Sequence, residues 1–144
     1  PLARLYNLER ELDQALQEKI WLKSGGFLII QQTEAFVAID VNTGKHSSKK
    51  DAEENYKQIN REAALEIARQ LRLRNLSGMI LVDFINMKNT NDQSELLQYM
   101  GSLVRSDPMQ TVVVDVTALG IMEITRKKSA KTLAEQLLQL KKGE

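Results

Sequence analysis

The chain has 144 residues, of which 42% are hydrophobic and 27% are charged, and its formal net charge is +1. This composition is typical of one globular domain with its own core, and the small net charge excludes a global field that attracts nucleic acid. The lack of cysteine excludes disulfides, thiolate zinc sites and cysteine nucleophiles. No apolar run reaches the length of a membrane span, so we expect a cytoplasmic protein without a membrane segment.

The first predicted elements are a helix, a turn and a pair of strands. Apolar residues recur at every fourth position and predict a helix over residues 7–20. Gly25 and Gly26 then turn the chain. Residues 27–32 and 35–41 read as two strands around the short connection Gln32-Thr33-Glu34, which predicts a β-hairpin.

A polar, basic stretch over residues 42–51 leads into a long helix. Asp51 is the expected N-cap, with Glu54 as its capping-box partner. The apolar stripe of this helix consists of Tyr56, Ile59, Ala63, Ile67 and Leu71. Because the helix connects two apolar strands, 35–41 and 79–84, we expect these strands to be parallel.

The last third of the chain contains two more helices and two more strands. A helix over 92–104 is expected to end before Asp107-Pro108. Residues 111–116 are rich in β-branched side chains and predict a third core strand. A strand over 121–125 and a helix over 130–140 follow. Together these elements predict an α/β fold with a mixed β-sheet flanked by helices.

Two of the apolar strands end in aspartates, Asp40 and Asp83. Asn42 faces the same side of its strand as Asp40, because residues two apart share a face. Open α/β sheets bind ligands at the carboxyl ends of their strands, and Mg²⁺ is typically held by one or two carboxylates. The pair therefore predicts a Mg²⁺ site, with Mn²⁺ as a substitute. The alternative is that each aspartate caps a helix or turn, which we favour for a third strand-end residue, Asp115.

Two basic groups are candidates for phosphate contacts. Lys45, Lys49 and Lys50 follow the first aspartate, and Arg126 and Lys127 follow the last strand. Such contacts position a nucleic-acid backbone without identifying its sequence. The one tryptophan, three tyrosines and three phenylalanines predict no row of stacking side chains.

Several segments of the chain resemble the ribonuclease E/G family. They include Ala-Ile-Asp-Val-Asn-Thr-Gly at 38–44, the runs at 60–64, 66–76 and 78–87, and the run at 119–127. The resemblance implies a deoxyribonuclease-I-like catalytic subdomain of a larger enzyme, spanning residues 1–144. Within it, residues 1–24 form an N-terminal helix and lead-in, and residues 25–144 form the mixed-sheet core.

The resemblance also implies site roles and an activity. The aspartates matching Asp40 and Asp83 hold a catalytic Mg²⁺, and the asparagine matching Asn42 assists. The implied reaction is endonucleolytic hydrolysis of single-stranded RNA to 5′-phosphate and 3′-hydroxyl ends in RNA processing and decay. On this basis Lys45, Lys49, Lys50, Arg126 and Lys127 are the expected RNA-binding residues.

The expected partners are single-stranded RNA and other domains of the same enzyme, and a homo-oligomer is left open. The chain has Asn86 where the family usually has aspartate and Ala118 where it usually has arginine, and Pro108 follows Asp107 where arginine is usual. Two alternatives therefore remain. One is a non-catalytic RNA-binding or assembly module that keeps the fold. The other is a metal-dependent phosphodiesterase that acts on DNA, since a fold alone does not determine the substrate.

Overall fold

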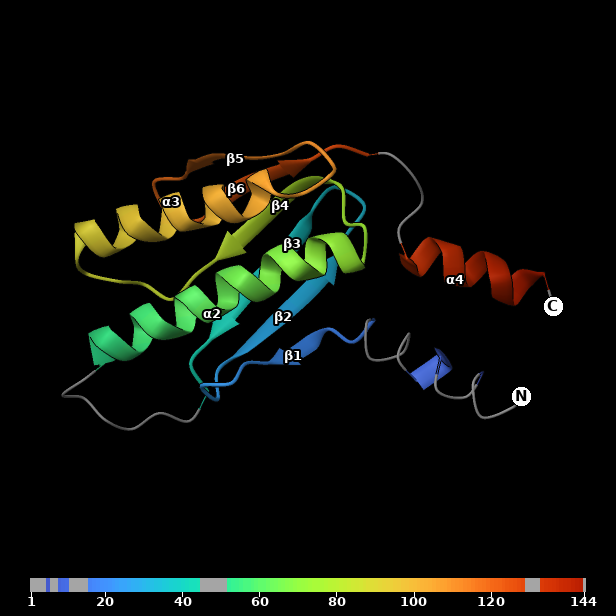
Figure 1. Ribbon diagram of the computed structural model, residues 1–144, viewed down its shortest axis with the longest axis horizontal. Helices are drawn as coiled ribbons and strands as arrows, with labels where there is room; N and C mark the ends of the chain where they lie inside the picture. Colours follow the sequence, from blue (N-terminus) through green and yellow to red (C-terminus); the bar gives the residue numbers. More distant parts are fainter. Residues whose placement is uncertain (1–4, 6–7, 11–15, 45–51, 129–132, 144) are drawn as a thin grey trace.

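The protein is built around one open β-sheet of mixed strand direction (Figure 1). The computed structural model describes residues 5, 8–10, 16–44, 52–128 and 133–143. The strands are β1 (Lys19–Trp21), β2 (Phe27–Gln32), β3 (Val37–Asn42), β4 (Gly78–Asp83), β5 (Thr111–Val116) and β6 (Met122–Arg126), in the spatial order β1-β2-β3-β4-β6-β5. Among these described strands only β3 and β4 are parallel; the other neighbouring pairs are antiparallel. The predicted mixed-sheet α/β fold and its parallel strand pair are confirmed.

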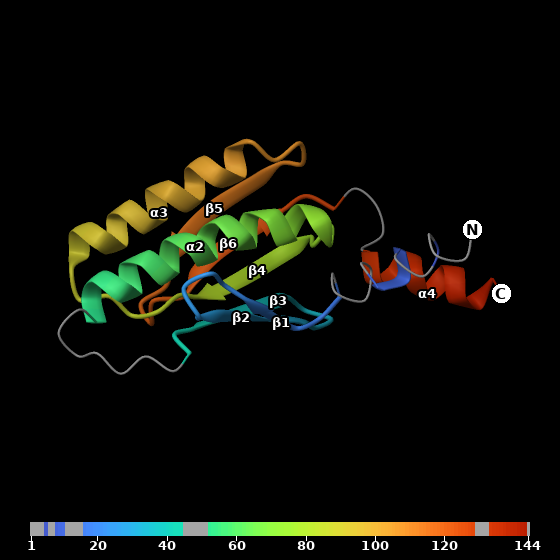
Figure 2. The same cartoon turned by 60° about the horizontal axis from the view of Figure 1, so that its bottom comes forward.

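The sheet has one covered face and one open face. Helices α2 (Ala52–Leu73) and α3 (Thr90–Arg105) lie side by side on the covered face (Figure 2). No helix of the described ranges lies on the opposite face, because α4 (Leu133–Lys142) lies beyond the end of the sheet (Figure 1). None of the described helices is long and apolar enough to cross a membrane.

The core lies between α2, α3 and the covered face of the sheet. The stripe of α2 is buried as predicted, with Ile59, Ala63, Ile67 and Leu71 fully enclosed and Tyr56 partly so. Alternate residues of the central strands meet this stripe, among them Ile39 and Ile80. Burial of such side chains is the main stabilising term of the fold, at roughly 1.5–3 kcal/mol for each large aliphatic residue.

The prediction of a helix over residues 7–20 is wrong at its carboxyl end. Residues 8–10 are helical, but Lys19–Trp21 is strand β1, whose Ile20 pairs with Leu28 of β2. The four-residue spacing that included Ile20 was coincidental, because antiparallel pairing across the turn at Gly25 determines this segment. The sheet therefore begins within the predicted lead-in of residues 1–24.

The strand predicted over residues 111–116 is confirmed with these bounds, but it is not a central strand of the core. This strand, β5, lies at the edge of the sheet, and β6 separates it from β4. Val112, Val114 and Val116 are 46%, 56% and 38% exposed. β-Branched composition favours extended structure but does not distinguish an edge strand from a central one. The predicted cap Asp51 lies outside the described residues.

Candidate metal centre

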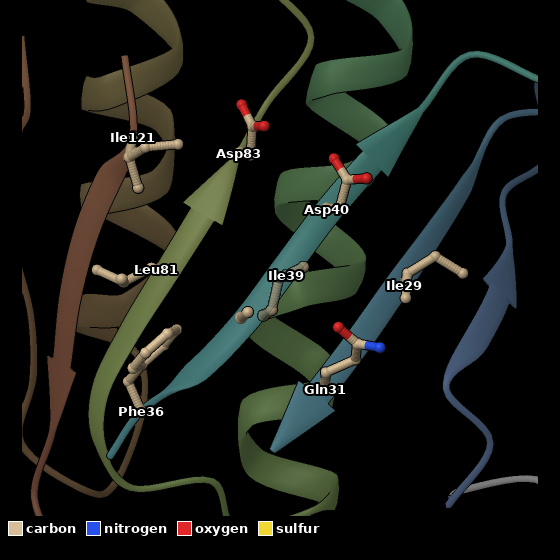
Figure 3. Close-up of a pocket in the computed structure, with 9 residues that line it drawn as sticks. Ile29, Gln31, Phe36, Ile39, Asp40, Leu81, Asp83 and Ile121 are labelled. Atoms are coloured by element: carbon tan, nitrogen blue, oxygen red, sulfur yellow. The ribbon is translucent and has the colours of Figure 1, made fainter. Parts of the chain in front are cut away.

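Asp40 of β3 and Asp83 of β4 lie directly opposite each other in the parallel strand pair. Alternation along the strands directs Ile39, Val41 and Val82 into the core, which leaves both aspartates on the open face. Figure 3 shows the two carboxylates at the ends of adjacent strands, with the helices behind the sheet. The expectation that these strand ends meet is confirmed, and adjacent strands are about 5 Å apart.

Asn42 stands beside this pair on the same face. Its Nδ2 donates a hydrogen bond to Oδ2 of Asp40 over 3.3 Å. This contact bears out the prediction that Asn42 and Asp40 point together. Because an amide does not titrate, Asn42 keeps its donor at any pH and can orient the ionised carboxylate of Asp40.

Two turns approach each other closely behind Asn42. Gly44 has φ +71°, and a Cβ there would lie 2.4 Å from the carbonyl oxygen of Gly25. A Cβ on Gly26 would lie 2.7 Å from the carbonyl oxygen of Asn42. The chain after β3 is therefore packed against the turn before β2, and only glycine fits at these positions. This packing determines the backbone position of Asn42.

We expect Gly44→Ala to destabilise the protein and weaken the site together. The substitution adds a Cβ against the Gly25 carbonyl and requires a left-handed backbone that alanine disfavours, so the free energy of unfolding should fall by at least about 1 kcal/mol. Gly101→Ala in α3 is the matched control, since a Cβ there meets nothing within 4 Å and alanine favours helix. Chemical denaturation of both variants checks this, and a stable Gly44→Ala protein would contradict it.

The two carboxylates repel each other. Partial burial, and then the negative charge of Asp40, raise the pKa of Asp83 above its usual range. The ionised pair is therefore held together by the fold at some loss of stability. A bound cation would relieve both effects, since it would replace lost hydration and neutralise charge.

Asp83→Asn is expected to stabilise the protein at pH 7 in the absence of metal. The folded-state pKa of Asp83 is raised, so the wild-type free energy of unfolding falls as pH rises from the unfolded value of 3.8 through the folded value. The variant cannot ionise and avoids this fall. Solvent screening keeps the gain below about 1 kcal/mol. Thermal unfolding at pH 3 and pH 7 tests this: the gain should vanish at the lower pH, and a lower midpoint at pH 7 would contradict it.

The carboxylates stand at the end of a shallow, largely apolar concavity on the open face (Figure 3). Its volume is about 340 Å³. Its lining consists of Ile29, Gln31, Phe36, Ala38, Ile39, Asp40, Leu81, Asp83 and Ile121. Apolar neighbours lower the local dielectric and strengthen the interaction of the two carboxylates with a cation.

The donor set fits a hard divalent cation that keeps part of its water. Two carboxylates and the nearby amide oxygen of Asn42 provide oxygen ligands only, which suits Mg²⁺ or Mn²⁺. The described residues contain no group of three or more His, Cys, Asp or Glu side chains that could enclose an ion. The fit is therefore to an ion shared between protein, water and substrate oxygens, as Mg²⁺ sites commonly are.

The structure corrects the prediction for Arg126. Its side chain is 4% exposed, and its Nε and Nη2 donate to the Asp107 carboxylate over 2.8 and 3.2 Å. Its Nη1 donates to Asn75 Oδ1 and to the carbonyl oxygen of Leu76. With its donors used inside the protein, Arg126 does not contact an external phosphate.

The other predicted basic residues divide into two groups. Lys127 is exposed directly after β6, so its role in RNA binding stays a prediction. Lys45, Lys49 and Lys50 lie outside the described residues. Asp115 does not join the carboxylate pair, since it lies on β5 opposite Glu123 of β6.

The sequence analysis missed an aromatic pair on the open face. The ring centroids of Trp21 and Phe27 are 5.1 Å apart, and Lys19 Nζ lies 4.2 and 4.3 Å from them. The error followed from the helix predicted over residues 7–20. Had Lys19–Trp21 been recognised as a strand, alternation would have put Lys19 and Trp21 on one face.

The paired carboxylates at the carboxyl ends of two parallel strands make this an α/β protein of the kind that binds a ligand at its strand ends. Comparison with known proteins identifies the family. The model of the Ribonuclease E/G family matches residues 1–129. Ribonuclease G of Escherichia coli (strain K12) is 40% identical over 137 residues, which cover 95% of this chain and 28% of the relative. Ribonuclease E of Nostoc sp. (strain PCC 7120) is 39% identical over 135 residues, covering 94% and 20%. The chain therefore belongs to the ribonuclease E/G family and spans less than a third of the length of these curated relatives.

Proposed function

We propose that this chain is the catalytic subdomain of a Mg²⁺-dependent endoribonuclease that hydrolyses single-stranded RNA to 5′-phosphate and 3′-hydroxyl ends. The observation that carries the proposal is the in-register pair Asp40 and Asp83, with Asn42 hydrogen-bonded to the first of them. Membership of the family and the names of its relatives, Ribonuclease G and Ribonuclease E, support RNA as the substrate.

In this proposal each polar residue of the site has a distinct task. Asp40 and Asp83 hold the cation, and Asn42 holds Asp40 in the orientation that leaves its second oxygen available. The cation, when bound, supplies positive charge that stabilises the phosphodiester transition state and makes water more acidic. Water adds to phosphorus, the bond from phosphorus to the 3′ oxygen breaks, and the 3′ oxygen gains a proton. Lys45, Lys49 and Lys50 contact flanking phosphates. Lys127 follows the end of β6 that pairs with Gly78, at the end of β4 opposite Asp83, and therefore contacts a more distant phosphate.

The proposal extends to the rest of the enzyme. Two carboxylates and a shallow concavity offer little area for capturing a long polymer, so further domains of the same enzyme are proposed to hold the RNA. The chain alone is then expected to cleave weakly. The proposed setting is the cytoplasm, where RNA processing and decay would supply the substrate.

A titration of isotopically labelled protein with Mn²⁺, followed by NMR, tests the metal site without requiring activity. Selective broadening around Asp40, Asn42 and Asp83, reversed by Mg²⁺, is expected. Asp83→Asn should lose this broadening, whereas Asp115→Asn, a carboxylate on β5 outside the pair, should keep it. Broadening elsewhere, or none at millimolar Mn²⁺, would contradict the proposal.

Binding and cleavage assays on the same protein distinguish the competing functions. RNA binding that is equally tight in Mg²⁺ and in EDTA, with no cleavage at any enzyme concentration, would favour a non-catalytic RNA-binding or assembly module. Cleavage of a DNA strand matched to the RNA, at an equal rate, would favour a phosphodiesterase without preference for RNA. Cleavage of the RNA strand alone supports the proposal.

A further inference from the structure

Lys19, Trp21 and Phe27 form an exposed cluster on the open face of the sheet. Trp21 is the single tryptophan of the chain and is 63% exposed. Its ring is tilted by 58° against Phe27, with the centroids 5.1 Å apart. The ammonium group of Lys19 lies within 4.3 Å of both ring centroids. The two rings and the ammonium group therefore offer a flat ligand both stacking and cation–π contacts.

The cluster lies in the same register rows as the candidate metal centre. One row across the strands runs Lys19, Ile29, Asp40 and Asp83, and the next row runs Trp21, Phe27 and Asn42. Residues in one row share a face of the sheet, and both rows lie on the open face, so these side chains are presented together. With strands about 4.8 Å apart, Lys19 lies about 10 Å from Asp40.

The chemistry of this face favours a nucleic-acid strand over a protein partner. A protein that covered the face would bury the ionised pair Asp40 and Asp83, which is strongly unfavourable without compensating charge. A single-stranded nucleic acid would instead bring a flat base to the two rings and a phosphate to Lys19. Aromatic side chains beside cationic groups are common features of single-strand binding surfaces.

We propose that Trp21 and Phe27 form a stacking platform for a base of the single-stranded RNA whose backbone lies at Asp40 and Asp83, and that Lys19 contacts the phosphate next to that base. The inference rests on the proposed function for the identity of the polymer. Stacking needs neither the cation nor base-specific hydrogen bonds, so this subsite binds RNA in EDTA and tolerates different bases. It holds the RNA on β1 and β2, next to the strands that carry Asp40 and Asp83, and so positions the phosphodiester at these carboxylates.

The single tryptophan provides a direct measurement. The probe is a short single-stranded oligoadenylate, added to the 144-residue protein in EDTA so that no cleavage takes place. Trp21 fluorescence is expected to be quenched by the oligoadenylate but not by an abasic strand of equal length and charge. Because a stacked base is worth a substantial part of the binding energy, Phe27→Leu should weaken binding about 10-fold, and Lys19→Gln should weaken it and reduce its salt dependence.

Tyr99→Leu is the matched control. Tyr99 makes a similar contact with a cation, with Arg61 Cζ 4.2 Å from the ring centroid, but it belongs to α3 on the covered side. Binding by this variant should be unchanged. Circular dichroism shows whether Phe27→Leu is folded, and the exposed substitution Lys19→Gln keeps the inference testable if it is not.

The failures of the inference and of the proposed function are distinguishable. Equal quenching by the abasic strand, or none by the oligoadenylate while Mn²⁺ still broadens Asp40 and Asp83, overturns the platform and leaves the proposed function standing. Quenching by the oligoadenylate alone without Mn²⁺ binding supports the platform and overturns the metal site. If sedimentation shows a dimer, and acrylamide does not quench Trp21 in the absence of RNA, a second copy of the chain covers this face. That result overturns the platform.

Discussion

Replacing Asp40 or Asp83 by asparagine is expected to reduce Mg²⁺-dependent RNA cleavage at least about 100-fold, the scale at which loss of one electrostatic group affects a preorganised site. Asparagine keeps the shape of the side chain and removes its charge. Because the two carboxylates lie opposite each other in one row, each supplies half of the negative charge that would hold the cation. The measurement is single-turnover cleavage of an end-labelled RNA with protein in excess, so that weak activity stays visible.

The double variant, with Asp40→Asn and Asp83→Asn together, tests whether both carboxylates hold the same ion. If both carboxylates hold one ion, the second substitution should add little to the first, because groups that act as a unit are not additive. Asp115→Asn serves as the control, since Asp115 lies on β5 outside the pair. Unchanged cleavage in both single variants would exclude the assigned site. If the wild-type chain does not cleave, the same variants can be compared after its segment replaces the matching 137 residues of Escherichia coli Ribonuclease G.

The variant Asp83→Asn should lose Mg²⁺-dependent cleavage and gain stability in the absence of metal. Partial burial and the charge of Asp40 raise the pKa of Asp83, so the ionised carboxylate lowers the stability of the metal-free fold. A variant that is more stable without metal and inactive with it would separate the function of this residue from any role in folding. Local strain of this kind is typical of functional sites, where stability is lost for activity.

The candidate site could be predicted from the sequence because two short-range patterns determine it. Alternation places Asp40 and Asn42 on one face, and the crossover helix makes the strands ending at Asp40 and Asp83 parallel. The register that puts these two aspartates directly opposite each other could not be predicted. It depends on packing of α2 against the sheet, in which Ile59 and Ile67 are fully buried.

The errors share a physical cause, which is pairing between residues distant in the sequence. Arg126 is the last residue of β6 and precedes two lysines, so local context suggested a surface cation, whereas its partner Asp107 is 19 residues away. Ile20 continues the four-residue spacing of the predicted helix, but pairing with β2 makes Lys19–Trp21 a strand. The aromatic pair of Trp21 and Phe27 exists only because of that strand pairing, so it could not be predicted once the helix was assumed.

We expect substitution in the buried ion pair of Arg126 and Asp107 to lower the free energy of unfolding strongly. Their side chains are 3% and 2% exposed, and the Nε to Oδ2 distance is 2.8 Å. Asp107→Ala would leave a buried guanidinium without its counter-charge, which costs about 3–5 kcal/mol. Arg69→Gln is the control, because Arg69 is 61% exposed in its pair with Glu66 and such pairs contribute at most about 1 kcal/mol. Urea unfolding compares the two, and similar midpoints would contradict the prediction.

The pH dependence of this pair follows from its hydrogen bonds. Burial alone would raise the pKa of Asp107, but hydrogen bonds from Arg126, the Met109 amide and the Thr111 hydroxyl hold it below its usual range. The stabilisation is therefore fully present above the unfolded value of 3.8 and is lost as pH falls through the folded value. The difference in stability between wild type and Asp107→Ala should be constant from pH 5 to 7 and narrow below about pH 4. A constant difference down to pH 2 would show that packing, and not the charge of Asp107, stabilises this end of the sheet.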